Sequence, residues 1–121
     1  MNFSEQKPIY LQIADWLCEQ ILLGKIKSEE RILSLRELAS QLEVNPNTVM
    51  RAYDMLQEMN IITCKRGMGY FATNEAMERI TELRRERFID EELPKLFHTM
   101  KLLHIDIGTL VGLYQNNSSE L

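Results

Sequence analysis

The sequence predicts a mainly α-helical protein with one small β-hairpin, and three observations lead to this prediction. Apolar residues recur at helical spacing along most of the 121 residues. Two helix-start signals, at Ser34 and Asn45, lie close enough together for two short helices joined by a turn. A run of β-forming residues interrupted by Gly67 and Gly69 follows. Helix, turn, helix and hairpin in this order are typical of a winged helix-turn-helix.

The first element is a helix over residues 8–23. Its apolar side chains recur at helical spacing: Ile9, Tyr10, Ile13, Trp16, Leu17 and Ile21. Gly24 follows directly and ends the helix. Residues 25–33 then form a connector, and we expect a short strand around residues 31–33 that could pair with the hairpin.

The second helix begins at Ser34. Glu37 follows three residues later, so the two side chains can each satisfy a backbone N–H at the helix start, as in a capping box. The apolar face of this helix comprises Leu35, Leu38, Ala39 and Leu42. Val44 and Asn45 make the turn to the next helix.

The third helix begins at Asn45, which suits the N-cap position. Pro46 suits the first helical position, where its missing N–H costs nothing. One face is apolar and comprises Val49, Ala52, Tyr53 and Leu56. Asn60 occupies the place where a left-handed residue commonly ends a helix.

The hairpin follows, with β-forming residues at 61–64 and at 70–71. Its tip reads Lys-Arg-Gly-Met-Gly over residues 65–69. Glycines at a hairpin tip permit positive φ and close approach to another molecule. The two basic residues beside them suit a phosphate backbone.

A helical region follows the hairpin, so we place a domain boundary between residues 1–73 and 74–121. Pro94 kinks or restarts the first long helix, His104 and Ile105 break the pattern, and Asp106 can cap a last short helix. We expect a frayed tail at the end. Two or three helices cannot bury this region's apolar residues alone, so we predict a homodimer interface. It comprises Met77, Ile80, Leu83, Phe88, Leu96, Phe97, Leu110 and Leu113.

Composition places the chain among ordinary globular proteins, with 45% hydrophobic and 26% charged residues. No apolar run approaches the ~20 residues that a membrane-spanning helix needs, and the N-terminus has no signal-peptide core. We therefore expect a cytoplasmic protein. The net charge is −4, and residues 1–73 hold 8 Lys and Arg against 9 Asp and Glu. A nucleic-acid surface must then come from local placement of the cations.

The sequence contains no pattern typical of an enzyme or a metal site. Cys18 and Cys64 lie far apart, without a CxxC motif or a His pair, and we interpret them as reduced, partly buried thiols. His98 and His104 are isolated and we interpret them as structural. No nucleophile–base pair or phosphate loop is present, so we expect neither catalysis nor a cofactor.

Five separated motifs together resemble a known family. They are Pro8-Ile9-Tyr10-Leu11-Gln12-Ile13, then Gly24, Ser34-x-Arg36-Glu37-Leu38-Ala39, Asn45-Pro46-Asn47-Thr48-Val49 with Ala52-Tyr53, and Gly67-x-Gly69-x-Phe71. Residues 8–73 resemble the N-terminal DNA-binding domain of GntR-type bacterial transcriptional regulators. The short helical remainder is similar to that of the YtrA-type subfamily. This resemblance implies dimerisation through the C-terminal helices and no large effector domain.

The chain departs from the family pattern at several positions. Leu33 stands where relatives usually have Pro, Glu29 where they have Gly, and Asn60 where they have Gly. Many relatives carry Arg in the recognition helix where this chain has Pro46 and Met50. Contacts made by relatives at these last two positions are therefore not carried over to this chain. Arg36, Thr48 and the hairpin glycines, Gly67 and Gly69, do match the family pattern.

We predict a DNA-binding site on the two central helices and the hairpin. It comprises Ser34, Arg36, Asn47, Thr48, Arg51, Lys65, Arg66, Gly67 and Gly69. For several of these a plainer interpretation exists: Arg36 and Arg51 as solvated charges, Asn47 and Thr48 as capping residues. Tyr53 is expected in the core, with a phosphate contact of its hydroxyl as the alternative.

These features predict a sequence-specific DNA-binding transcriptional regulator. We expect a homodimer that binds double-stranded DNA at a palindromic operator and acts as a repressor. The alternative is a winged-helix module for protein–protein assembly, which the acidity permits. The sequence leaves open whether a small-molecule effector is sensed.

Overall fold

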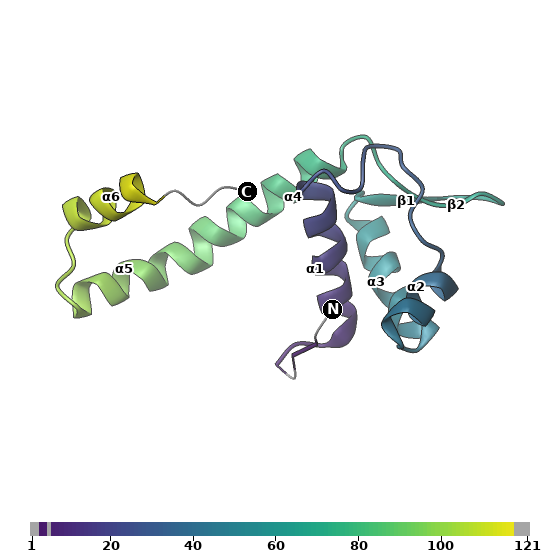
Figure 1. Ribbon diagram of the computed structural model, residues 1–121, viewed down its shortest axis with the longest axis horizontal. Helices are drawn as coiled ribbons and strands as arrows, with labels where there is room; N and C mark the ends of the chain where they lie inside the picture. The colour runs from purple at the N-terminus through teal and green to yellow at the C-terminus, as the bar shows by residue number, and fades with distance from the viewer. Residues whose placement is uncertain (1–2, 5, 118–121) are drawn as a thin grey trace. The chain divides into compact units, whose positions relative to one another are not determined.

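The fold, seen in a computed structural model, is described for residues 3–4 and 6–117. The chain divides into two compact units, Met1–Thr81 and Glu82–Leu121. The predicted mainly α-helical fold with one two-stranded hairpin is confirmed (Figure 1). The elements are α1 (Ile9–Leu22), α2 (Leu35–Leu42), α3 (Pro46–Glu58), β1 (Ile62–Lys65), β2 (Gly69–Ala72), α4 (Ala76–Arg87), η1 (Phe88–Glu92), α5 (Leu93–Leu102) and α6 (Ile107–Asn116). Within the described residues, no helix has the length and apolar character required to span a membrane.

The first unit is built around α3, which packs against α1, α2 and β1. The apolar face predicted for α3 is buried completely. The largest fully buried side chains of the unit are Tyr53, Ile13, Leu38, Leu56, Ile61, Ile80 and Val49. Because these come from four helices and from the residue just before β1, and Ile62 and Ala72 of the hairpin are buried with them, one shared core holds the helix-turn-helix and the hairpin together.

Tyr53 links α3 to both of its neighbours along the chain. Its hydroxyl donates a hydrogen bond of 2.6 Å to the carbonyl oxygen of Leu33, just before α2. Its ring meets that of Tyr70 on β2 edge to face, with centroids 4.8 Å apart. The alternative role as a phosphate ligand is therefore wrong, because the hydroxyl lies in the core and already has an acceptor.

The hairpin β1–β2 is antiparallel, with Ile62 opposite Ala72 and Lys65 opposite Gly69. The short strand expected around residues 31–33 is reduced to one isolated bridge, between Arg31 and Phe71. Backbone bonds such as Ile32 N–H to Tyr70 O, at 2.9 Å, continue this pairing. The connector therefore covers the outer edge of β2.

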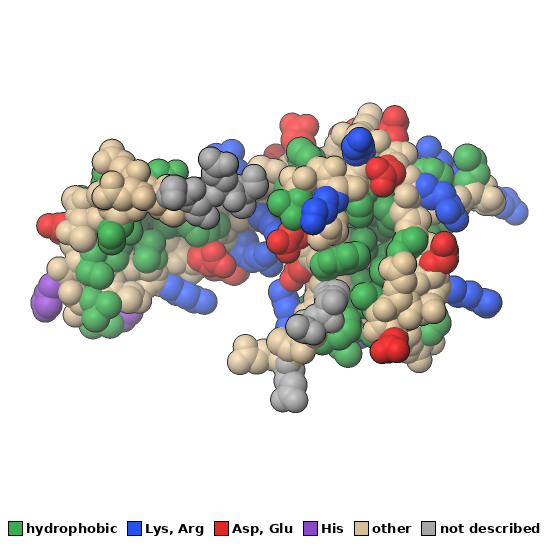
Figure 2. Space-filling view, viewed as in Figure 1, with side chains coloured by type: hydrophobic (Ala, Val, Ile, Leu, Met, Phe, Trp, Pro, Cys, Tyr) green, Lys and Arg blue, Asp and Glu red, His purple; other side chains and the backbone are tan. Residues whose placement is uncertain are grey.

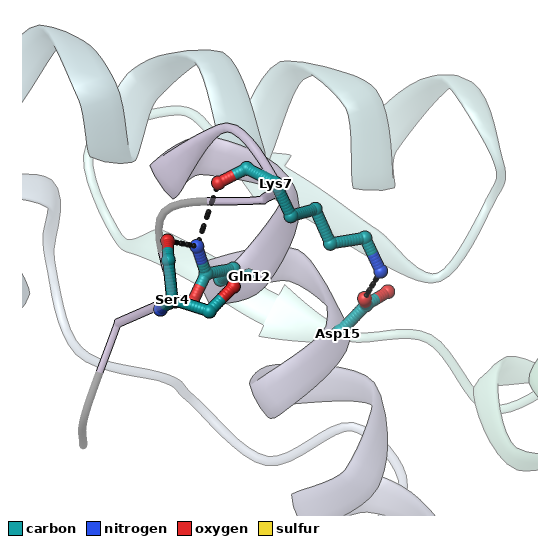
Figure 3. Close-up of polar contacts among 4 residues, drawn as sticks. All are labelled: Ser4, Lys7, Gln12 and Asp15. Carbon is teal, nitrogen blue, oxygen red and sulfur yellow. Dashed lines mark hydrogen bonds and ion pairs between the residues drawn. The ribbon is translucent and has the colours of Figure 1, made fainter.

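The side chain of Gln12 holds the segment before α1 through three hydrogen bonds (Figure 3). Its amide nitrogen donates to the carbonyl oxygens of Ser4 at 2.8 Å and Lys7 at 2.7 Å. Its amide oxygen accepts from the Ser4 N–H at 2.8 Å. Lys7 also forms an ion pair with Asp15, one turn further along α1. Gln12 thus fixes the path of the chain into α1.

The start of α4 belongs to the first unit. Ala76 and Ile80 are 2% and 1% exposed and join the core of the winged unit, so the unit ends later than the residue 73 that we expected. Ile80 was predicted in the dimer interface, and this is wrong. Its side chain is already buried within its own chain and is unavailable to a second one.

The second unit contains a π-helical segment, η1, between α4 and α5. The N–H of Leu93 bonds to the carbonyl oxygen of Phe88, five residues back. Pro94 follows at the start of α5 and lacks an N–H. A continuous α-helix would need the N–H of residue 94 for its i to i−4 hydrogen bond, and the wider π-helical turn of η1 accommodates the absence of that N–H. Pro94 therefore restarts the helix, as one of the two expected outcomes.

A left-handed residue, His104, separates α5 from α6 as expected. Asp106 caps α6 by accepting the Thr109 N–H at 2.8 Å, and this bond holds the pKa of the Asp106 carboxyl below its ordinary value. Met100 is the one buried apolar side chain among the described residues of this unit. Part of the predicted frayed tail, residues 118–121, lies outside the described residues, while residues 115–116 end α6.

Candidate nucleic-acid interface

The N-terminal end of α3 presents polar side chains from a well-defined cap. Glu43 ends α2 in the left-handed conformation, and the chain then turns into Asn45. The Asn45 side chain accepts the Asn47 N–H at 2.8 Å, and Pro46 occupies the first helical turn as predicted. Asn45 is therefore the capping residue, which leaves the Asn47 side chain exposed and that of Thr48 half-buried.

The start of α2 carries Ser34 and Arg36. The predicted capping box is confirmed: the Glu37 N–H donates to Ser34 Oγ at 3.1 Å, and the Ser34 N–H donates to Glu37 Oε1 at 3.0 Å. The bond from the Ser34 N–H holds the pKa of Glu37 below its ordinary value. Arg36 is exposed on the same turn. Ser34 thus has a structural role first, and its contact with DNA stays a prediction.

Arg51 lies one helical turn after Asn47 and is exposed. Its guanidinium stacks on the ring of Tyr10 at the start of α1, 4.0 Å from the centroid. Such a cation–π contact restricts a long side chain without neutralising its charge. Arg51 is therefore neither a freely solvated side chain nor a buried one. It is an exposed cation on α3 whose side chain is oriented by the Tyr10 ring.

The tip of the hairpin carries the other predicted cations. Lys65 lies over the ring of Phe71, with Nζ 4.5 Å from the centroid, and Arg66 is exposed beside it. Gly67 and Gly69 both adopt positive φ, at 78° and 106°, as the tip requires. Figure 2 shows Lys and Arg side chains at the end of the winged unit where this hairpin projects.

Arg31 is an exposed cation at the hairpin that the sequence reasoning missed. Its Nε donates to the carbonyl oxygen of Met68 at 3.2 Å, so its side chain reaches the hairpin tip from the connector. The expected pairing of residues 31–33 with the hairpin was a signal that could have placed it there. Cys64, predicted to be partly buried, is instead exposed on β1, while Cys18 is buried.

Acidic residues lie on the same stripe of α3 as the polar ones. Asp54 and Glu58 follow Asn47 and Arg51 at helical spacing, and both are exposed. With a rise of about 1.5 Å per residue, Asp54 lies about 10 Å along the axis from Asn47. The exposed stripe is therefore polar and cationic at its N-terminal half and acidic at its C-terminal half. Only the first half suits a polyanion.

No residue cluster in the described ranges is suited to hold a metal ion. His98 and His104 are both exposed, on α5 and in the turn after it. The start of α3 and the hairpin tip expose hydrogen-bond donors, acceptors and cations, the groups that contact base edges and phosphates in DNA-binding proteins.

Residues 9–71 match the family model described as bacterial regulatory proteins, gntR family. The chain belongs to the GntR family. This GntR protein is 36% identical over 102 residues to the HTH-type transcriptional regulator YhcF of Bacillus subtilis, covering 84% of this chain and 83% of that one. It is 34% identical over 113 residues to the HTH-type transcriptional repressor YtrA of the same organism, covering 83% and 87%. The resemblance to YtrA-type regulators is thus confirmed.

Solved structures support the same relationship. A GntR-family regulator from Bacteroides thetaiotaomicron has a TM-score of 0.76 and 44% identity, covering 88% of this chain and 93% of that one. The structure of AraR(DBD) in complex with operator ORR3 has a TM-score of 0.55 and 25% identity, covering 60% and 88%. This GntR protein is a transcriptional regulator with a DNA-binding helix-turn-helix domain, and its family is one of regulators rather than enzymes.

Proposed function

We propose that this GntR regulator is a repressor that binds a palindromic operator as a homodimer. One observation carries the proposal: the N-terminal half of α3 exposes Asn47 and Arg51, and the elements before and after it in the chain also expose cations, on α2 and at the hairpin tip. In helix-turn-helix proteins the second helix enters the major groove with its N-terminal residues on base edges. The polar half of α3 is the half that this geometry would use.

The side chains divide naturally by chemistry. Arg36, Asn47 and Thr48 carry donors and acceptors that suit base edges, and a bidentate Arg contact with guanine is the commonest of these. Arg51 and the wing cations Lys65 and Arg66 suit phosphates, because stacking on aromatic rings holds Arg51 and Lys65 in place. Ser34, Gly67 and Gly69 would contribute by shaping the backbone beside them.

The second unit supports the homodimer. Its helices leave large apolar side chains in water, including Phe97 at 46% and Leu113 at 64% exposure. A shallow groove of about 880 Å³ lies along α6 and is lined mainly by Leu96, Leu110, Val111, Leu113 and Tyr114. Clusters of large exposed apolar side chains commonly occur at interaction sites of soluble proteins. A second copy would bury it, together with Met77, Leu83 and Phe88 from the predicted interface.

Repression is inferred from the name of one relative, the transcriptional repressor YtrA. The palindromic operator is inferred from symmetry, since a two-fold dimer presents two identical recognition helices to two half-sites. We infer a cytoplasmic location from the same role, because a regulator must share a compartment with the chromosomal DNA that it binds.

Selection of duplexes from a random pool by the full-length protein tests the proposal. We expect an enriched inverted repeat, and binding that weakens steeply with salt. Three phosphate contacts per protomer, made by Arg51, Lys65 and Arg66, predict a log–log slope of about −5 for the dimer. Enrichment of no sequence, with no salt-dependent binding, would instead favour the alternative of a module for protein–protein assembly.

Arg36→Ala tests the proposed register on the selected duplex. Loss of a charged base contact should weaken binding by about 1–3 kcal/mol, with an unchanged urea midpoint because the side chain is exposed. Lys27→Ala is the matched control, since it removes one exposed positive charge from the connector. Equal affinities for the two variants would show that α2 is not docked as proposed.

A further inference from the structure

Arg31 on the connector contacts the hairpin twice: its backbone pairs with β2, and its side chain reaches the tip. The backbone forms the isolated bridge to Phe71 on β2. The side chain runs along the hairpin, where Nε donates to the Met68 carbonyl oxygen at 3.2 Å. A two-stranded hairpin is marginally stable by itself, so contacts from the connector help to hold it in place.

Gly69 makes this contact possible. A Cβ added at Gly69 would lie 3.2 Å from Arg31 Nε, 3.6 Å from Nη2 and 3.8 Å from Cζ. Any side chain there would therefore meet the guanidinium. At Gly67, by contrast, an added Cβ meets nothing within 4 Å. Gly69 therefore leaves room for the Arg31 guanidinium, whereas Gly67 faces open space.

The positive charge of Arg31 lies near groups of both α2 and the hairpin. Besides the cap bonds from Ser34, the positive charge of Arg31 helps to lower the pKa of Glu37 at the start of α2. On the hairpin, its bridge partner Phe71 carries Lys65 on its ring. Arg31 therefore lies between the helix-turn-helix and the wing cations. The bond to Met68 uses one of its five N–H donors, so others can meet a phosphate.

We propose that Arg31 is a positioning residue that braces the wing, so that Lys65 and Arg66 meet the DNA backbone as one preorganised group. This rests on the proposed duplex binding. Preorganised cations bind without the entropy cost of ordering a mobile tip. Gly69 serves the brace, by leaving room for the guanidinium, rather than serving the approach of DNA.

Arg31→Lys separates bracing from charge. Lysine keeps the positive charge but has neither the Nε donor nor the planar fork. We expect Arg31→Lys to weaken binding to the selected duplex by about tenfold, the value of one hydrogen bond to a charged group, with a circular dichroism spectrum that still reports the folded state. Lys27→Ala on the same connector is the control and should stay near wild type. Wild-type affinity for Arg31→Lys would overturn the proposal.

A double-mutant cycle with Arg66 tests the positioning itself. If Arg31 holds the wing in place, Arg66→Ala should cost less in the Arg31→Lys background than in wild type. Backbone amide exchange at Met68 and Tyr70 should also be faster in DNA-free Arg31→Lys, a readout that a simple phosphate contact would not move. Additive affinities or unchanged exchange would each refute the brace.

The role of Gly69 is tested by a second cycle. Gly69→Ala should weaken binding in wild type, and should cost less in the Arg31→Ala background, where no guanidinium remains to be displaced. An equal cost in both backgrounds would show that Gly69 serves the approach of DNA instead. If the wild-type chain binds no duplex in a salt-dependent way, the proposed function fails, whereas faster exchange in Arg31→Lys would still identify the brace in the free protein.

Discussion

Replacing Tyr53 by Phe removes one oxygen from the centre of the winged unit. Tyr53 is 0% exposed, and its hydroxyl donates at 2.6 Å to the carbonyl oxygen of Leu33. Phe retains the ring and its edge-to-face contact with Tyr70. The change therefore deletes a hydrogen bond and leaves a half-buried carbonyl without its donor, while the apolar packing stays.

The expected loss follows from these two terms. A neutral hydrogen bond contributes about 1 kcal/mol net, and a buried polar group left without a partner costs about 1–3 kcal/mol. Because Leu33 is only half-buried, water can partly replace the donor, so we expect a loss of about 1–2 kcal/mol for Tyr53→Phe. In a unit of this size each kcal/mol lowers the melting temperature by about 4–8 °C.

Urea unfolding followed by circular dichroism measures the difference. Tyr70→Phe is the matched control, because Tyr70 is half-buried and the structure records no hydrogen bond of its hydroxyl to the described residues. We expect a lower midpoint for Tyr53→Phe, an unchanged slope and a near-wild-type midpoint for the control. Equal midpoints for the two variants would show that the bond to Leu33 does not stabilise the fold.

The same side chain makes stability depend on alkaline pH. Burial raises the pKa of Tyr53 above its ordinary value of 10.0. The folded state therefore retains the proton after the unfolded chain has lost it, so this contribution is complete below about pH 10 and is lost as the pH rises further. Tyr53→Phe should show a shallower alkaline decline than wild type. Parallel curves would contradict the assignment.

Four further results are expected. Leu113→Asp places a charge in the α6 groove and should give a monomer by sedimentation at tens of micromolar. Ser40→Asp, on the exposed surface of α2, is the control and should stay dimeric. A monomeric wild-type protein at this concentration would contradict the proposed homodimer. Ile80→Ala should cost about 2–4 kcal/mol in urea without changing the oligomeric state. Ser34→Ala should cost about 1 kcal/mol. The cap bonds from Ser34 lower the pKa of Glu37, so the contribution of this carboxylate to folding stability is present above its ordinary pKa of 4.5 and is lost as the pH falls. Glu37→Gln should therefore make the free energy of unfolding depend less on pH in the acid range.

Local features of the winged unit were predictable because each depends on residues a few positions apart. The capping box of Ser34 and Glu37, the cap at Asn45 and the left-handed Asn60 all follow from side-chain size and hydrogen bonding within one turn of chain. The apolar face of α3 was predictable for the same reason, since helical spacing alone defines it. The elements and their order therefore followed from short-range physics.

Contacts between distant residues were not predictable in this way. Arg31 lies 37 positions before the Met68 carbonyl that it binds, and Arg51 stacks on Tyr10 from another helix. No spacing rule relates such pairs, because the pairing of elements in space decides them. Ile80 was assigned to the wrong surface for this reason: its apolar spacing was recognised, but spacing does not say which core the stripe faces.

The division of charge along α3 affects how the protein would search a genome. Binding to random DNA draws on phosphate contacts alone, and a competing chromosome offers about 10⁶–10⁹ such sites. Residues 1–73 carry no excess of positive charge, and Asp54 and Glu58 repel the backbone wherever α3 lies too deep or too flat in a groove. Few molecules would then be sequestered on random sequence. Occupancy of the operator would depend on a small number of well-placed cations and amides.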